Sequence, residues 1–199
     1  MKESKRIKKN RGMTYVELIV VLSIFAVMSS IVLFNYGEFQ AKVDIKNLAS
    51  DIALKIVEAQ KSALSGNFPA KFTLDKKPSF GVYFNLIGND ADGIAFNKKF
   101  IYFADLDNGS KYDSPSEKLD TIYITKNNFI EKLEVIYGTN CSTNPNTLGV
   151  VFKRPDSGAK ITSNGSLCAS LSYAQITIKS PRSATATIKI YPSGRVQVN

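Results

Sequence analysis

The Gly12–Met13 peptide bond and the carboxylate of Glu17 are the features of this chain whose types and spacing suggest chemistry. A basic segment ends at Gly12, and Glu17 is the only charged residue between Gly12 and the end of the uncharged run over residues 18–34. A single carboxylate at the rim of an apolar helix is costly in lipid unless a cation pairs with it. Cleavage after Gly12 would create such a cation, because Met13 would then carry a new α-amino group. The spacing predicts a chain that is first processed and then assembled.

The apolar segment is placed to remain in the protein as a membrane helix. A secretory signal is cut after its apolar region, whereas here the small residue precedes it. Residues 13–36 would form a helix of roughly 36 Å at about 1.5 Å per residue, which is enough to cross a hydrocarbon core of about 30 Å. The preceding lysines and arginines favour the cytoplasmic side, which predicts a single-pass protein of the cytoplasmic (inner) membrane with its C-terminal part outside. An uncleaved anchor has the same hydropathy and remains the alternative.

Charge and composition limit the classes of function. Residues 1–12 hold six of the 26 Lys and Arg but one of the 17 Asp and Glu, so this short segment contributes +5 to the formal net charge of +9, as much as residues 66–199. The chain has no histidine, and its carboxylates, lysines and tyrosines stand at no recognisable catalytic spacing. We expect no enzymatic activity, no catalytic residue and no resident cofactor.

Residues 12–17, Gly-Met-Thr-Tyr-Val-Glu, followed by the long apolar helix, resemble the class III signal of type IV pilins and type II secretion pseudopilins. The resemblance in motif covers residues 5–36. In that family a prepilin peptidase cuts after the glycine and N-methylates the new first residue, which here would be Met13. The glutamate at the fifth mature position, here Glu17, pairs with the N-terminal amine of a neighbouring subunit during assembly.

The resemblance also implies an architecture and a set of partners. The fold class would be α+β, with a long N-terminal helix packed on an antiparallel, meandering β-sheet head. The partners would be the prepilin peptidase, other pilin or pseudopilin subunits, a membrane assembly platform and membrane lipid. The subunit would enter a pilus or pseudopilus, as a minor component. Many pilins break the membrane helix with Gly or Pro, whereas Ala26 and Phe34 stand at those positions here, so local melting of the helix is not implied.

Periodicity divides the rest of the chain into a second helical part and a strand-rich head. Apolar residues recur at three- and four-residue steps over residues 37–65, which predicts an amphipathic continuation of the helix that ends near Gly66. From residue 66 to 199 the period becomes two, which predicts an antiparallel sheet because the connections are too short for crossover helices. The predicted strands are residues 71–74, 80–84, 100–103, 121–124, 132–136, 148–152, 174–178, 186–190 and 195–198. Residues 140–146 and 157–166 are rich in turn formers and are predicted to be linkers.

The C-terminal strands raise the question of nucleic-acid binding. Residues 187–198 resemble the closing hairpin of H-type minor pseudopilins and their pilus relatives. Some relatives that serve DNA uptake carry Gly-Arg-x-Arg there, but residues 194–197 are Gly-Arg-Val-Gln and lack the second arginine. The candidate contacts for DNA or another anion are Lys179, Arg182, Lys189 and Arg195. A solvated sheet surface, on which lysines discourage aggregation, is the favoured interpretation.

Cys141 and Cys168 are the only cysteines of the chain, and both fall in the part predicted to lie outside the cytoplasm. Two isolated cysteines in turn-rich segments there predict one disulfide, with free thiols as the alternative. Such a disulfide would stabilise the fold by roughly 3–4 kcal/mol in the chain-entropy model.

Carboxylates that follow the strand at residues 100–103 suggest a calcium loop. Asp105, Asp107 and Asp113 could supply oxygen ligands for Ca²⁺, although the spacing is one residue short of the EF-hand pattern and Lys111 would lie close to the ion. A plain turn at residues 107–109 explains the same residues and is favoured.

The sequence therefore predicts four parts: a cleaved cytoplasmic leader (1–12), a transmembrane and assembly helix (13–36), an amphipathic continuation (37–65) and a β-sheet head (66–199). The predicted function is that of a prepilin-like subunit. The alternatives are a membrane-anchored extracytoplasmic binding module, which needs neither Gly12 nor Glu17, and a minor pilin that binds DNA for uptake.

Overall fold

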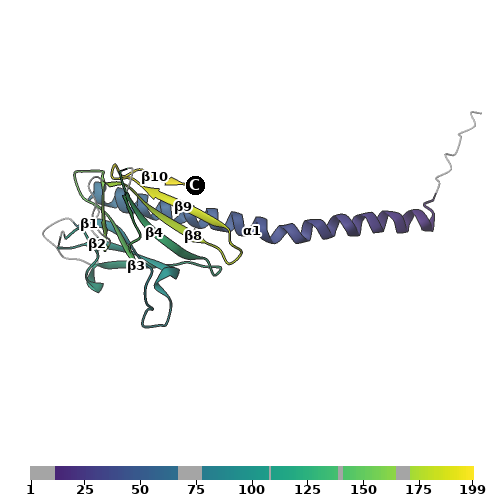
Figure 1. Cartoon of the computed structure of the whole chain (residues 1–199), viewed down its shortest axis with the longest axis horizontal. Coiled ribbons are helices and arrows are strands. Elements are labelled where there is room, and N and C mark those ends of the chain that lie inside the picture. The colour runs from purple at the N-terminus through teal and green to yellow at the C-terminus, as the bar shows by residue number, and fades with distance from the viewer. Residues whose placement is uncertain (1–11, 67–77, 108, 139–140, 165–170) are drawn as a thin grey trace, which may run out of the picture. The chain divides into compact units, whose positions relative to one another are not determined.

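The computed structural model describes residues 12–66, 78–107, 109–138, 141–164 and 171–199. The chain forms two compact units, which meet in sequence at Gln40 and Ala41. One long helix and a set of antiparallel strands make up the described residues, which confirms the predicted α+β class. Figure 1 shows these elements.

The helix α1 (Tyr15–Ser65) runs through both the apolar segment and its amphipathic continuation. It ends as predicted at Gly66, whose φ of 63° lies in the left-handed region and whose N–H donates to the Ala63 carbonyl at 3.2 Å. Glycine adopts this conformation without a Cβ clash, which is why it commonly terminates helices. No break interrupts the helix at Ala26 or Phe34.

The second part of α1 buries one stripe of small and branched apolar residues. The positions that are at most 1% exposed are Ile45, Ala49, Ile52, Ile56, Ala59 and Ala63. They recur every three to four residues and so share one face of the helix. The predicted amphipathic stripe is confirmed, and its buried residues belong to the same core as the strands.

The strands form two five-stranded sheets in which every pair is antiparallel. The first sheet has the order β3-β2-β1-β6-β7, with β1 (Ser79–Asn85), β2 (Lys99–Asp105), β3 (Lys118–Tyr123), β6 (Thr147–Phe152) and β7 (Ala159–Ser163). The second has the order β10-β9-β8-β4-β5, with β4 (Phe129–Tyr137), β5 (Cys141–Thr143), β8 (Leu171–Lys179), β9 (Thr185–Ile190) and β10 (Val196–Val198). Short 3₁₀ helices, η1 (Phe96–Lys98) and η2 (Pro115–Glu117), precede β2 and β3.

Each predicted strand from residue 80 onward has a counterpart, but the arrangement is not one simple meander. The chain leaves the first sheet after β3, builds β4 and β5 in the second, and returns to place β6 beside β1. The two predicted linkers contain strands, β5 and β7, because β4 and β6 offer them edges to pair with. The predicted strand at residues 71–74 lies outside the described residues.

The inner faces of both sheets and the buried stripe of α1 form one hydrophobic core. The first sheet contributes alternate residues such as Phe80, Val82 and Phe84 of β1, and the second contributes Ile176 and Ile178 of β8. This alternation follows from the two-residue period of a strand. Strand periodicity in the sequence therefore indicated which side chains enter the core.

Gly81 of β1 has almost no room for a side chain. A Cβ added there would lie 2.7 Å from the carbonyl oxygen of Val150 and 2.9 Å from the ring of Phe103, its cross-strand neighbour. We expect Gly81→Ala to lower the free energy of unfolding by about 1–3 kcal/mol, because overpacking forces the backbone of a neighbouring strand to move. Thermal unfolding of the full chain in detergent, followed by circular dichroism, measures this effect.

The matched control for Gly81→Ala is Gly12→Ala, whose added Cβ meets nothing within 4 Å. Both proteins are made in a host without a prepilin peptidase, so that their N-termini are identical. An unchanged midpoint for Gly81→Ala would mean that β1 and β6 separate easily at this point.

Candidate functional site

The start of α1 forms a reciprocal cap between Thr14 and Glu17. The Thr14 hydroxyl accepts the N–H of Glu17 at 3.3 Å, and Oε2 of Glu17 accepts the N–H of Thr14 at 3.4 Å. Thr-x-x-Glu at the first turn is a capping box, which satisfies two N–H groups that lack partners inside the helix. A carboxylate is also favoured there by the helix dipole. The cap holds Glu17 at the N-terminal end of the helix, where Glu17 is the fifth residue after the Gly12–Met13 peptide bond.

Gly12 is not required by the fold of the described chain. A Cβ added to Gly12 would meet no heavy atom within 4 Å, and Gly12 is not among the described glycines with positive φ. The residue could therefore carry a side chain without strain. If glycine is needed at this position, the requirement comes from a partner that recognises this segment.

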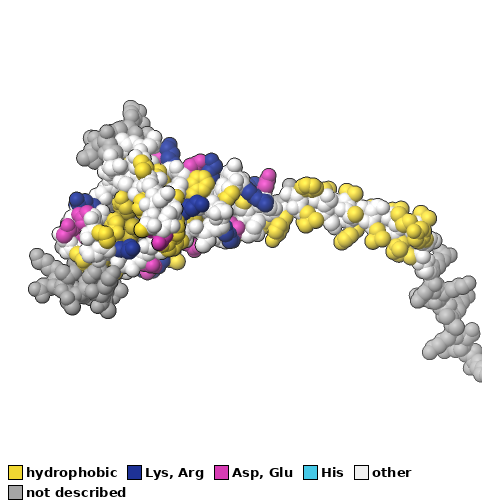
Figure 2. All heavy atoms as spheres, turned by 90° about the horizontal axis from the view of Figure 1, so that it is seen from below, with side chains coloured by type: hydrophobic (Ala, Val, Ile, Leu, Met, Phe, Trp, Pro, Cys, Tyr) yellow, Lys and Arg dark blue, Asp and Glu magenta, His cyan; other side chains and the backbone are white. Residues whose placement is uncertain are grey.

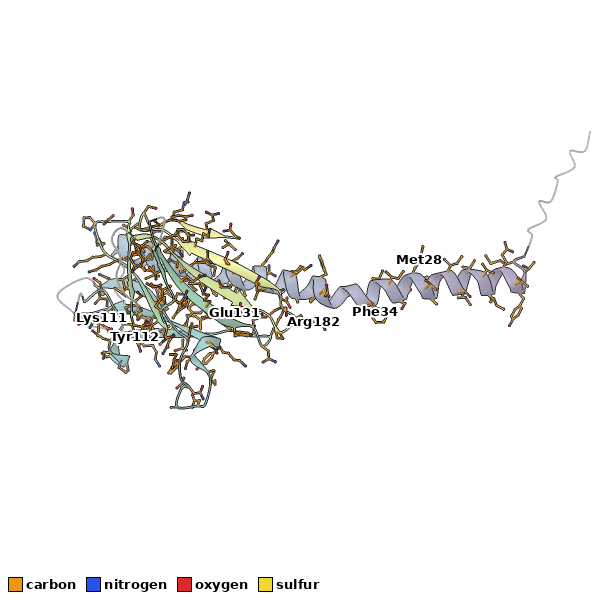
Figure 3. All side chains as sticks on the ribbon, viewed as in Figure 1. Met28, Phe34, Lys111, Tyr112, Glu131 and Arg182 are labelled. Atoms are coloured by element: carbon orange, nitrogen blue, oxygen red, sulfur yellow. The ribbon has the colours of Figure 1, made fainter. Side chains whose placement is uncertain are left out.

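The apolar first part of α1 presents its side chains outward. Its large apolar side chains between Leu18 and Phe34 are exposed, from 45% for Ile19 to 84% for Phe34. Figure 2 shows hydrophobic side chains following one another along this stretch, and Figure 3 shows Met28 and Phe34 projecting from the helix. The Ser23 hydroxyl donates to the Ile19 carbonyl at 2.8 Å, so this polar group already has a partner within the helix.

By length and composition α1 is able to span a membrane or to act as a signal, and no other helix in the described residues passes that test. Its most apolar window of 18 residues has a mean hydropathy of 2.6, with none of it buried. Apolar surface of this extent is covered by lipid or by other chains in a stable protein.

The four cations predicted to contact DNA do not form one free basic patch. Lys179 forms an ion pair with Glu131. The Nζ of Lys189 lies 4.8 Å from the centre of the Tyr173 ring. Arg182 is exposed in the turn between β8 and β9 (Figure 3).

Lys189 and Arg195 belong to a row of cations and aromatic rings that runs from β8 and β9 into the turn between β9 and β10. The Arg195 guanidinium lies 4.1 Å from the centre of the Tyr191 ring, and the rings of Tyr191 and Tyr173 are 5.7 Å apart. Together with Lys189, these residues form a continuous cation–π row. Sequence reasoning missed both tyrosines, although aromatic residues close to cations on neighbouring strands were a usable signal.

The predicted cysteine pair is not described. Cys168 lies outside the described residues, and the side chain of Cys141 is likewise outside them. The disulfide stays a prediction.

Three carboxylates converge where β2 ends, but they are not the three that the sequence suggested. Asp105, Asp107 and Glu117 each place a carboxylate oxygen within 4.8 Å of the others. Asp113 is not part of this group, and its carboxylate lies 3.4 Å from the Nζ of Lys111. The carboxylate group in the described residues therefore contains Glu117 and not Asp113, and metal binding stays a prediction.

The 3₁₀ helix η2 explains how Glu117 reaches the cluster. The Ser114 side chain caps this helix by accepting the N–H of Ser116 at 3.3 Å, and Pro115 occupies its first turn. Glu117 then accepts the N–H of Leu106 at 3.1 Å and that of Asp113 at 3.2 Å, one on each oxygen. A Ser-Pro pair before a glutamate was the sequence signal for such a turn.

Asp105 and Asp107 differ strongly in environment. Asp105 is fully buried, and burial together with the neighbouring Asp107 carboxylate raises the pKa of its carboxyl to about 6. Asp107 is exposed, and its pKa is lowered chiefly by the N–H of Gly109, which donates to Oδ1 at 2.7 Å. The cluster thus combines a carboxyl that resists ionisation with one that ionises readily.

The segment between β2 and β3 is held on the first sheet by Tyr112. The Tyr112 ring lies 5.2 Å from the Tyr83 ring and 5.3 Å from the Phe103 ring, centre to centre. It also lines a pocket of about 320 Å³ with Phe96 and Phe100. Figure 3 shows Tyr112 and its neighbour Lys111 at this end of the sheet.

No family model matches the chain, and no curated protein or solved structure matches it either. The capped start of α1, its exposed apolar stretch and the antiparallel β-sheet head therefore stand as the basis for assigning a function.

Proposed function

We propose that the chain is a prepilin-like subunit, cleaved between Gly12 and Met13 and assembled through its N-terminal helix into a type IV pilus or a type II secretion-type pseudopilus. The observation that carries this proposal is the capping box, which places Glu17 at the start of an exposed apolar helix. The described architecture, a long apolar helix whose second part packs on antiparallel sheets, is consistent with a pilin-like protein.

The physical argument for assembly starts from the exposed apolar stretch of α1. In the cytoplasmic membrane, lipid covers these side chains, while the leader stays inside and the head outside. Outside the membrane they must be covered by equivalent helices of other subunits. Within such a bundle the Glu17 carboxylate needs a cation, and the α-amino group of Met13 of a neighbouring subunit supplies one.

The partners that follow are the prepilin peptidase, other pilin or pseudopilin subunits, a membrane assembly platform and membrane lipid. We propose a structural rather than catalytic role, and a minor place in the fibre. A membrane-anchored binding module has the same helix and head but needs neither cleavage nor the Glu17 charge. DNA uptake has less support, since Lys179, Lys189 and Arg195 are already engaged within the chain.

The N-terminus of the mature protein tests the proposal directly. We expect protein extracted from membranes of a host with its own prepilin peptidase to begin at an N-methylated Met13, as measured by intact mass and N-terminal peptide mass. The same gene expressed without the peptidase is the control and should retain residues 1–12. A leader that stays attached beside an active peptidase would favour the membrane-anchored binding module.

A further inference from the structure

The carboxylate cluster at the end of β2 contains more negative charge than the described protein compensates. Asp105 and Glu117 are 0% and 2% exposed, and Asp107 lies beside them. Among the described residues, no lysine or arginine forms an ion pair with any of the three. Buried carboxylates in proteins are normally paired with a cation or bound to a metal.

The nearby lysines are directed to other partners. Lys160 of β7 donates to the Ser110 hydroxyl at 3.0 Å, and Lys111 lies beside Asp113. Neither ammonium group forms an ion pair with the three carboxylates, and only the charge of Lys111 acts on Asp107, so most of the repulsion within the cluster is uncompensated.

An oxygen of Asp105 provides the second, independent observation. Oδ2 accepts the N–H of Ser110 at 3.0 Å, whereas Oδ1 is buried and accepts no hydrogen bond within the described structure. An unsatisfied buried acceptor destabilises the folded state, and more strongly when it is charged. A ligand that binds this oxygen would remove that destabilisation.

The kind of ligand follows from the donor set. Carboxylate oxygens are hard ligands that suit calcium and magnesium rather than softer metals. Magnesium usually takes one or two carboxylates and keeps most of its water, whereas calcium accepts several carboxylates in flexible geometry at about 2.3–2.6 Å. Oxygens that lie within 4.8 Å of one another are close enough to bind one such ion together, because two ligands on opposite sides of calcium are about 5 Å apart.

We propose that Asp105, Asp107 and Glu117 form a calcium site that fastens the segment between β2 and β3 to the first sheet. The site joins the end of β2 to η2, and Tyr112 lies between these two elements in the sequence. Calcium would therefore stabilise the position of Tyr112 on Tyr83 and Phe103, and with it one wall of the neighbouring pocket. The site does not depend on pilin function, since it lies wholly within the head.

The test uses the full chain in detergent, stripped of metal with EDTA and titrated with CaCl₂ and with MgCl₂ by isothermal titration calorimetry. We expect one calcium ion per chain with a Kd of about 10⁻⁴–10⁻³ M, the range of extracellular calcium modules, and weaker binding of magnesium. Calcium should also raise the unfolding temperature, because it binds the folded state preferentially.

Asp107→Asn is the main variant, because the side chain is exposed and asparagine keeps an oxygen that can accept the Gly109 N–H. It should weaken calcium binding by about tenfold or more, since even changes outside the ligand shell have effects of that size. Asp113→Asn is the matched control: it makes the same change in the same segment, but outside the cluster, and should bind calcium like the unaltered chain. Glu117→Gln provides a second test, with circular dichroism to show that the chain is folded.

Two results would overturn the proposal. One is the absence of both binding heat and a rise in unfolding temperature at millimolar CaCl₂. The other is a loss of binding in Asp113→Asn as large as that in Asp107→Asn. Neither result depends on whether the N-terminus is processed, so failure of the calcium site and failure of the pilin proposal are distinguishable.

Discussion

Gly12→Ala is expected to leave residues 1–12 attached to nearly every molecule and to exclude the protein from the fibre fraction. The added methyl group meets nothing within 4 Å in the chain itself, so the folding of the head should be unaffected. The loss would arise in the peptidase, whose active site must approach the backbone on both sides of the cleaved bond. Intact mass and N-terminal peptide mass of the membrane protein measure the effect.

Gly37→Ala is the matched control for this experiment. It makes the same substitution inside α1, where alanine is a better helix former than glycine by about 1 kcal/mol, and it should be cleaved normally. If Gly12→Ala were cleaved as completely as the unaltered chain, the proposed processing site would be wrong. If both variants kept the leader, the cause would be a general defect in membrane insertion.

Glu17→Val is expected to be cleaved normally but to remain in the membrane instead of entering fibres. Valine suits lipid, whereas the Met13 amine of the neighbouring subunit would lose its partner within an apolar bundle. Leaving one charge of a buried pair unpaired costs about 3–5 kcal/mol, which corresponds to more than about a hundredfold in subunit affinity. The ratio of processed protein in membranes to that in sheared fibres measures assembly.

Glu17→Gln separates the two roles that the structure suggests for this residue. Glutamine serves in a capping box as glutamate does, so it should preserve the start of α1 while removing the charge. If charge pairing drives assembly, Glu17→Gln should fail as Glu17→Val does. Assembly by the glutamine variant at the normal level would assign Glu17 to helix capping alone.

Glu38→Gln is the control for both Glu17 variants. Glu38 is a second exposed carboxylate on α1, beyond the uncharged stretch, and its loss changes the net charge equally. It should assemble like the unaltered protein. A defect equal to that of Glu17→Gln would mean that total charge, not the position of Glu17, governs assembly.

Local pattern was sufficient to predict α1 and the side chains that it buries. The three- and four-residue spacing from Ile45 to Ala63 specifies one helical face, whatever that face packs against, and the six positions of α1 that are at most 1% exposed lie on it. Gly66 marked the end of the helix for an equally local reason, its ability to adopt positive φ. The Thr14–Glu17 cap is equally local, since it joins residues three apart, although it was not predicted from the sequence.

Strand periodicity likewise predicted which residues of β1 and β8 face the core, but it carries no information on which strand lies beside which. The pairing of β1 with β6 joins residues far apart in sequence, and β5 and β7 exist because β4 and β6 have edges to offer them. The segments that form β5 and β7 are rich in turn-forming residues, so their local sequence favours loops. Pairing with a neighbouring strand makes them strands instead.

The sequence by itself determined the apolar helix, its N-terminal cap and its buried stripe, since each depends on residues within a few positions of one another. The tertiary structure decided that Glu117 rather than Asp113 joins Asp105 and Asp107, and that Tyr173 and Tyr191 lie between Lys189 and Arg195. These contacts depend on a 3₁₀ turn and on strand register, and register sets the neighbours of every side chain on a sheet. The composition of each site was therefore decided by contacts between elements, which the local pattern of residues does not specify.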